Sequence, residues 1–217
     1  MADSVLYDKD IREPLCFYLE ELFGKCRIFE EKRMGDSRAD MVMVLPCALC
    51  GIEIKSDADS YARLSRQVKD YSAFFDFNYV VVGSTHVHHI KEHVPEEWGI
   101  ITVDNVEGQP DFYFLRQASP NPGMRRELKL SMLWRPELAH IQELNGLHKY
   151  PGKSKDFVRK YIIDSVQGVL LDKQISDELF ERDYDTIAEK INTYRAEHGQ
   201  KKHRRKRKRY RKVKALN

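Results

Sequence analysis

The stretch from Asp40 to Lys55 constrains the fold most, because it predicts two strands joined by a tight turn. It begins with an apolar run, carries turn signals around Pro46, and ends by alternating apolar and charged side chains. A turn centred just after Pro46 sets Asp40 opposite Glu53. Glu53 and Lys55 are two residues apart on a strand, so their side chains share one face of the sheet. Two carboxylates and an ammonium group are therefore expected at one patch.

This grouping of charges suits a divalent cation. Mg²⁺ takes oxygen ligands and is usually held by one or two carboxylates together with several waters. A bound cation polarises a phosphoryl oxygen and lowers the pKa of an attacking water, and a nearby lysine can stabilise the charge that develops on phosphorus. The patch thus predicts metal-assisted phosphodiester chemistry.

Residues 60–75 predict an amphipathic helix that follows the two strands. Its apolar stripe has helical spacing, and the polar Gln67 and the hydroxyl of Tyr71 lie one turn apart beside that stripe. Polar groups that face a sheet need hydrogen-bond partners, and the charged patch can supply them.

The pattern Asp40-x12-Glu53-Ile-Lys55, with Gln67-x3-Tyr71 on the next helix, resembles the PD-(D/E)XK nuclease superfamily and the extra motif of its RecB-type branch. The resemblance covers roughly the first half of the chain, and Ala39 stands where the nominal motif has proline. It implies an α/β fold with a restriction-endonuclease-like core, a mixed β-sheet flanked by helices.

The resemblance also implies roles for individual residues. Asp40 and Glu53 would bind Mg²⁺ or Mn²⁺, the Ile54 carbonyl would complete the metal shell, and Lys55 would serve the attacking water. Gln67 and Tyr71 would line the site or contact DNA. The alternative is a surface hairpin that carries a Glu–Lys pair on its exposed face.

Charged residues on either side of Asp40 have two interpretations each. Glu30 or Glu31, on a predicted strand over residues 27–31, is either a third metal-binding carboxylate or a solvated edge charge. Arg38 either contacts phosphate or pairs with a nearby acidic side chain.

Basic residues are concentrated in the final segment, residues 200–217. This tail holds 11 of the 37 basic residues and no acid, so the preceding part carries 26 basic against 34 acidic residues. A tail this charged is expected to be disordered by itself, to bind phosphates in a salt-sensitive, sequence-blind way, and to include as nucleic-acid-binding residues Lys201, Lys202, Arg204, Arg205, Lys206, Arg207, Lys208, Arg209, Arg211 and Lys212.

Turn signals divide the remaining chain. We predict a nuclease-like core over residues 1–118, a linker at 119–123, a helical subdomain over 124–199 and the tail at 200–217. Helices are expected over 8–23, 155–171 and 185–196 and, bearing four histidines, over 85–93. The subdomain is either a DNA-binding appendage, with basic residues Lys149, Lys153, Lys155, Arg159 and Lys160, or a plain helical cap with an exposed basic face.

The cysteines and the N-terminus favour a cytoplasmic protein. Cys47 and Cys50 have the spacing of half a zinc site, but a second such pair is missing, so reduced thiols are the preferred interpretation. No apolar run reaches the ~18 residues of a membrane span, and the first residues do not resemble a signal peptide.

The leading hypothesis is a metal-dependent nuclease that hydrolyses DNA, with Mg²⁺ or Mn²⁺ as cofactor. The residues do not discriminate DNA from RNA as the partner, and a homodimer or an additional protein partner is compatible with them. The alternative is a non-catalytic nucleic-acid-binding protein of the same fold that acts through its basic tail. A third hypothesis is an interaction protein whose basic tail binds an acidic protein partner. DNA repair, recombination, phage biology and defence all fit the leading hypothesis.

Overall fold

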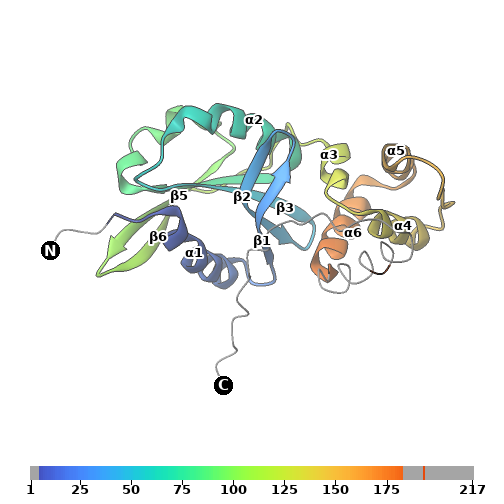
Figure 1. The fold of residues 1–217 in the computed structure, drawn as a ribbon, viewed down its shortest axis with the longest axis horizontal. Helices are drawn as coiled ribbons and strands as arrows, with labels where there is room; N and C mark the ends of the chain where they lie inside the picture. Colours follow the sequence, from blue (N-terminus) through green and yellow to red (C-terminus); the bar gives the residue numbers. More distant parts are fainter. Residues whose placement is uncertain (1–4, 183–192, 194–217) are drawn as a thin grey trace, which may run out of the picture. The chain divides into compact units, whose positions relative to one another are not determined.

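A computed structural model describes residues 5–182 and residue 193 of the chain. Its centre is an open sheet (Figure 1). The sheet has six strands, which lie in sequence order. The strands are β1 (Arg27–Met34), β2 (Ser37–Leu45), β3 (Ala48–Lys55), β4 (Phe77–Gly83), β5 (Gly99–Val106) and β6 (Gln109–Arg116).

The sheet is mixed, as the sequence predicts. Strands β1, β2 and β3 pair antiparallel, β3, β4 and β5 pair parallel, and β6 returns antiparallel to β5. The pairing of Leu45 with Ala48 places Pro46 and Cys47 in the turn between β2 and β3, which confirms the predicted hairpin. The α/β class and the flanking helices are confirmed with it.

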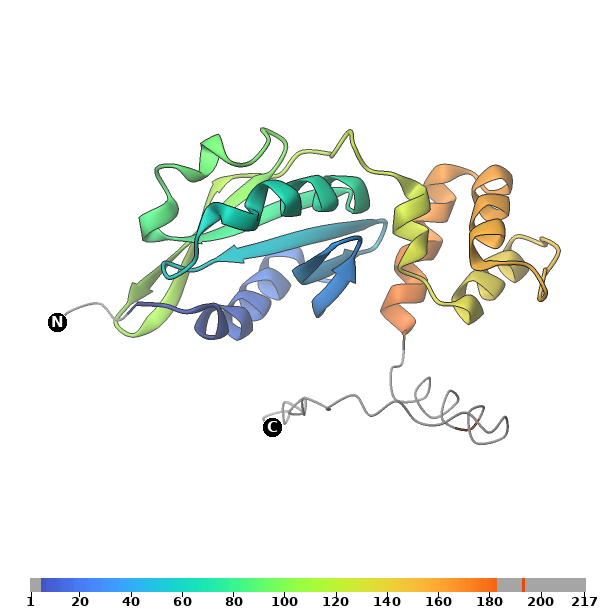
Figure 2. The ribbon, with the colours of Figure 1, turned by 45° about the horizontal axis from the view of Figure 1, so that its top comes forward.

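Each face of the sheet is covered by helices, because alternate side chains of every strand point to opposite faces. Helix α1 (Asp8–Phe23) covers one face and buries Ile11, Leu15 and Leu19, which are four residues apart. Helix α2 (Leu64–Phe74), preceded by the short turn η1 (Tyr61–Arg63), covers the other face (Figure 2). The odd-numbered residues of β3 from Leu49 onward lie on the α2 side.

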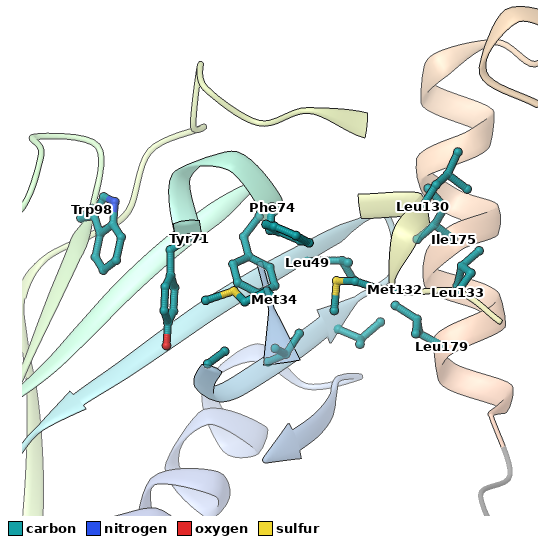
Figure 3. Close-up of a cluster of buried hydrophobic side chains, with 14 of the residues drawn as sticks. Met34, Leu49, Tyr71, Phe74, Trp98, Leu130, Met132, Leu133, Ile175 and Leu179 are labelled. Carbon is teal, nitrogen blue, oxygen red and sulfur yellow. The ribbon is translucent and has the colours of Figure 1, made fainter. Parts of the chain in front are cut away.

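Four further helices follow the sheet: α3 (Arg126–Ser131), α4 (Arg135–Leu144), α5 (Lys155–Ser165) and α6 (Gly168–Glu181). Their apolar side chains join the hydrophobic cluster beneath α2, and Figure 3 shows this cluster from Trp98 and Tyr71 to Ile175 and Leu179. The Ser154 hydroxyl accepts a hydrogen bond from Phe157 N and caps α5.

Polar contacts tie these helices to the sheet. Fully buried Lys129 of α3 donates to Asp76, which precedes β4, and to Asp172 of α6, both at 2.9 Å. In the predicted linker, the Asn121 amide donates to the Ser72 and Phe75 carbonyls at 2.7 Å. The described residues up to Glu181 accordingly form one compact unit.

The structure differs from the expected elements in three places. Strand β1 extends to Met34, beyond the predicted end at residue 31. The histidine segment forms two short 3-10 turns, η2 (Ser84–His86) and η3 (Ile90–Glu92), in place of a helix. The predicted helix over 155–171 is two helices, because Val166 is extended and α6 begins at Gly168.

Two histidines of this segment pack against Tyr61. The rings of His86 and His93 lie 4.8 and 4.1 Å from the Tyr61 ring, centroid to centroid. The predicted helix over 185–196 and the tail over 200–217 lie outside the described residues. None of the helices in the described part of the chain is long and apolar enough to cross a membrane.

Candidate active site

Asp40 lies where β2 and β3 begin to diverge. Their register ends with the pair Met41–Ile52, so Asp40 and Glu53 face each other one residue beyond the ladder, as predicted. The Ile54 N–H therefore finds a side chain in place of a backbone carbonyl, and it donates to Asp40 Oδ2 at 3.0 Å. This bond turns the Asp40 carboxylate into the gap between the two strands.

Glu53 is buried on the α2 side of β3, with 1% of its surface exposed. One carboxylate oxygen, Oε1, accepts hydrogen bonds from the Lys55 ammonium and from the Gln67 amide. The other oxygen, Oε2, accepts from the Tyr71 hydroxyl at 2.7 Å. The structure thus brings the predicted residues of β3 and α2 into one hydrogen-bonded group.

Tyr71 joins the two strands. Its hydroxyl accepts from the Asp40 N–H at 3.2 Å while it donates to Glu53. The Tyr71 side chain is fully buried and, unlike Glu53, does not line the pocket described below, so it positions both carboxylate-bearing segments without contacting a ligand there. Gln67 lines the pocket described below, and its Oε1 lies 3.3 Å from Lys55 Nζ.

The electrostatics of the group follow from its burial. Burial raises the pKa of Glu53 from 4.5 to about 7, and the Asp40 charge adds to the rise while Lys55 opposes it. Burial also raises the pKa of Tyr71 well above its ordinary value, and Glu53 and Asp40 add to that effect. A cation bound by both carboxylates would offset the Asp40 charge, which disfavours the ionised form of Glu53.

Arg12 of α1 is a site residue that the sequence analysis missed. Its guanidinium donates to Asp40 Oδ1 at 3.1 Å and to the Asp40 carbonyl at 3.0 Å, while Nε donates to Asp8 at 2.7 Å. Arg12 is half-buried, and its side chain is 15% exposed. The helical predictions place Arg12 on α1, but they do not show which way it faces across the sheet.

The two candidate third carboxylates lie among arginines. Glu31 has a positive φ of 53° at the position opposite Asp40, is exposed, and pairs with Arg38 at 3.5 Å. Glu30 lies 4.0 Å from the Arg12 guanidinium and is also exposed. Among the described residues, no three Asp, Glu, His or Cys side chains are placed to hold a metal ion. The contacts of Glu30 and Glu31 with arginines favour edge charges over a third ligand, and the contact of Arg38 with Glu31 favours acid pairing for Arg38.

A pocket of about 500 Å³ opens over this group. Asp40, Glu53, Ile54, Lys55 and Gln67 line it, together with side chains from β1, β2, η1 and α2. Two carboxylates beside an open pocket match the donor set that Mg²⁺ or Mn²⁺ uses when waters complete its shell. The residues present therefore fit a single divalent cation.

The cysteines and the basic residues of the helical part, for which the sequence suggested other roles, do not line this pocket. Cys47 is exposed and Cys50 is buried, and both are free thiols. Burial raises the pKa of Cys50 well above its ordinary value. In the helical part, Lys149 and Arg159 pair with Glu143 and Asp156, and neither lines the pocket.

Comparison with known proteins places the chain in a family. The model of the family described as Bacteriophage P4 protein cII matches residues 22–208. The chain belongs to this family. No curated protein is significantly similar to it in sequence.

One solved structure is similar, "The structure of Pyrococcus Furiosus SfsA in complex with Ca2+", with a TM-score of 0.31 and 16% sequence identity. The match covers 51% of this chain and 60% of that one, so the chain spans less than two thirds of that protein's length.

Proposed function

We propose that the chain is a metal-dependent nuclease of the PD-(D/E)XK type that hydrolyses phosphodiester bonds in DNA. The observation that carries the proposal is the convergence of Asp40, Glu53 and Lys55 beside one open pocket, with Gln67 and Tyr71 bonded to Glu53. Mg²⁺ or Mn²⁺, when bound by Asp40 and Glu53, would supply a Lewis acid and an activated water.

The chain's own residues would perform the remaining tasks. Tyr71 and Gln67 hold the Glu53 carboxylate in one orientation, and the Ile54 N–H holds that of Asp40. Lys55 is 4% exposed, and an ammonium group so shielded from water stabilises developing negative charge more strongly than a solvated one. Lys55 would thus stabilise the phosphorane and orient the attacking water.

A second candidate is a non-catalytic nucleic-acid-binding protein of the same fold. One observation favours it: both oxygens of Asp40 and both oxygens of Glu53 already have donors within the protein. A cation would have to share or displace some of these donors, of which Arg12 is the most exposed to solvent among the charged ones.

A cleavage assay separates the two candidates. The purified protein is incubated with single-stranded, double-stranded and branched DNA and with RNA, in Mg²⁺, in Mn²⁺ and in chelator. Cleavage that needs the cation and is lost in Glu53→Gln supports the nuclease, because Gln keeps the side-chain shape but not the charge. Cleavage at the wild-type rate by Glu53→Gln would refute the site assignment. Binding without cleavage under every condition would favour the second candidate.

A further inference from the structure

The side chains that line the pocket are buried at its floor and exposed at its rim. The floor is the mutually bonded group around Glu53 and Lys55. The rim carries exposed arginines from two flanks: Arg33 and Arg38 from the β1–β2 hairpin, and Arg63 and Arg66 from η1 and the first turns of α2. Arginines thus face the pocket from both sides.

Three of these arginines have no partner among the described residues. Arg33, Arg63 and Arg66 form no hydrogen bond or ion pair with any residue in the part of the chain that the structure describes. The pocket's acidic residues are mostly engaged, Asp8 with Arg12, Glu31 with Arg38 and Asp59 with Ser56. Among the described lining acids, Asp36 alone has no partner. Among the described residues, the rim therefore holds three guanidinium groups without a counter-ion, against the carboxylates of Asp36 and of Asp59, which bonds only to the neutral Ser56.

The hairpin carries two further signs of an anionic ligand. Arg33 lies directly opposite Arg38 across β1 and β2. Like charges in that position destabilise a sheet, and Glu31 supplies a counter-ion to Arg38 alone. The next pair brings Ser37 into the pocket lining. Ser37 is 5% exposed, and its hydroxyl has no hydrogen-bond partner among the described residues, which costs free energy unless a ligand supplies one.

We propose that Arg33, Arg63 and Arg66, with the Ser37 hydroxyl, bind the phosphodiester backbone of a nucleic-acid strand at the mouth of this pocket. Guanidinium groups bind phosphate through paired, charge-assisted hydrogen bonds. A phosphate group would accept a hydrogen bond from the Ser37 hydroxyl and would offset the repulsion between Arg33 and Arg38. The identity of the ligand rests on the proposed function. The inference adds a binding element on the body of the protein, separate from the basic tail.

The test measures binding in chelator, so that it does not depend on cleavage. Affinity of the full-length chain for a fluorescent single strand of about 16 nucleotides, as DNA and as RNA, is measured by anisotropy over a range of salt. The variant Arg33→Gln/Arg63→Gln/Arg66→Gln is compared with Lys69→Gln/Lys91→Gln/Arg125→Gln. This control loses the same charge, and none of its residues lines the pocket.

We expect the rim variant to bind at least about tenfold more weakly at low salt, with the slope of log K against log salt reduced by about 2, since each single-strand phosphate contact contributes about 0.7. The control should retain the wild-type slope. An unchanged slope in the rim variant, or an equal reduction in the control, would overturn the proposal.

A single substitution controls for the possibility that the triple variant fails to fold. Arg66 is exposed on α2, so Arg66→Gln should fold normally by circular dichroism and reduce the slope by about 0.7. The experiments distinguish failure of the proposed phosphate-binding rim from failure of the proposed nuclease activity. Unchanged binding slopes with normal cleavage would refute the rim alone, whereas reduced slopes without any cleavage would support the rim and argue against the nuclease.

Discussion

Replacing Glu53 by Gln should change how the protein's stability depends on pH. The folded state raises the pKa of Glu53 from 4.5 to about 7, so between these values the folded protein binds more protons than the unfolded chain. Stability from this group is therefore fully present below pH 4.5 and is lost as the pH rises through about 7. Each pKa unit corresponds to about 1.4 kcal/mol, so the loss is about 3 kcal/mol.

Glu53→Gln lacks this titration but keeps the shape that Lys55, Gln67 and Tyr71 contact. Urea unfolding of both proteins would be followed in chelator by the fluorescence of Trp98 and Trp134, at several pH values from about 4 to about 8. The free energy of unfolding of the variant minus that of the wild type should grow by about 3 kcal/mol across this range, because other titrations largely cancel. A difference that stays constant within about 0.5 kcal/mol would refute the reasoning.

Three further perturbations test the site and its support. Lys129→Ala leaves Asp76 and Asp172 without their shared cation and should lower the free energy of unfolding by about 3 kcal/mol in urea; a loss below about 0.5 kcal/mol would contradict this. Gly51→Ala puts a methyl group into the Tyr71 and Phe75 rings and should cost about 1–3 kcal/mol, while Gly152→Ala, which meets open space, should cost almost nothing; equal costs would count against the packing described. Arg12→Gln frees Asp40 Oδ1 and should tighten Mn²⁺ binding on the order of tenfold by calorimetry, whereas Arg12→Lys should not; an unchanged affinity in Arg12→Gln would show that Arg12 does not compete with the cation.

Local sequence patterns were sufficient to predict much of the sheet and the residues at the centre of the site. The turn after Pro46 fixes the register that sets Asp40 opposite Glu53, and strand alternation puts Glu53 and Lys55 on one face. The i, i+4 spacing of Gln67 and Tyr71 puts both on the buried side of α2, next to Glu53. Each of these steps depends on a short stretch of chain with one dominant periodicity.

The site residues that the sequence analysis did not predict are brought to the pocket by contacts between segments that are distant in sequence. Arg12 reaches Asp40 across 28 positions in sequence, and the side of α1 that faces the strand gap is set by how the whole helix packs. The rim arginines meet because the β1–β2 hairpin and α2 lie on either side of one pocket. Two rings of the histidine segment pack against Tyr61, more than twenty residues earlier, a contact that the local pattern does not show.

The central claim is that Asp40 and Glu53 together bind a divalent cation. Titration of the full-length chain with Mn²⁺, followed by electron paramagnetic resonance of the free ion, tests it directly. We predict one bound ion per chain, lost in both Asp40→Asn and Glu53→Gln and retained in Asp111→Asn, which removes an exposed carboxylate of β6. Equal Mn²⁺ binding by the wild type and by Glu53→Gln would contradict the account.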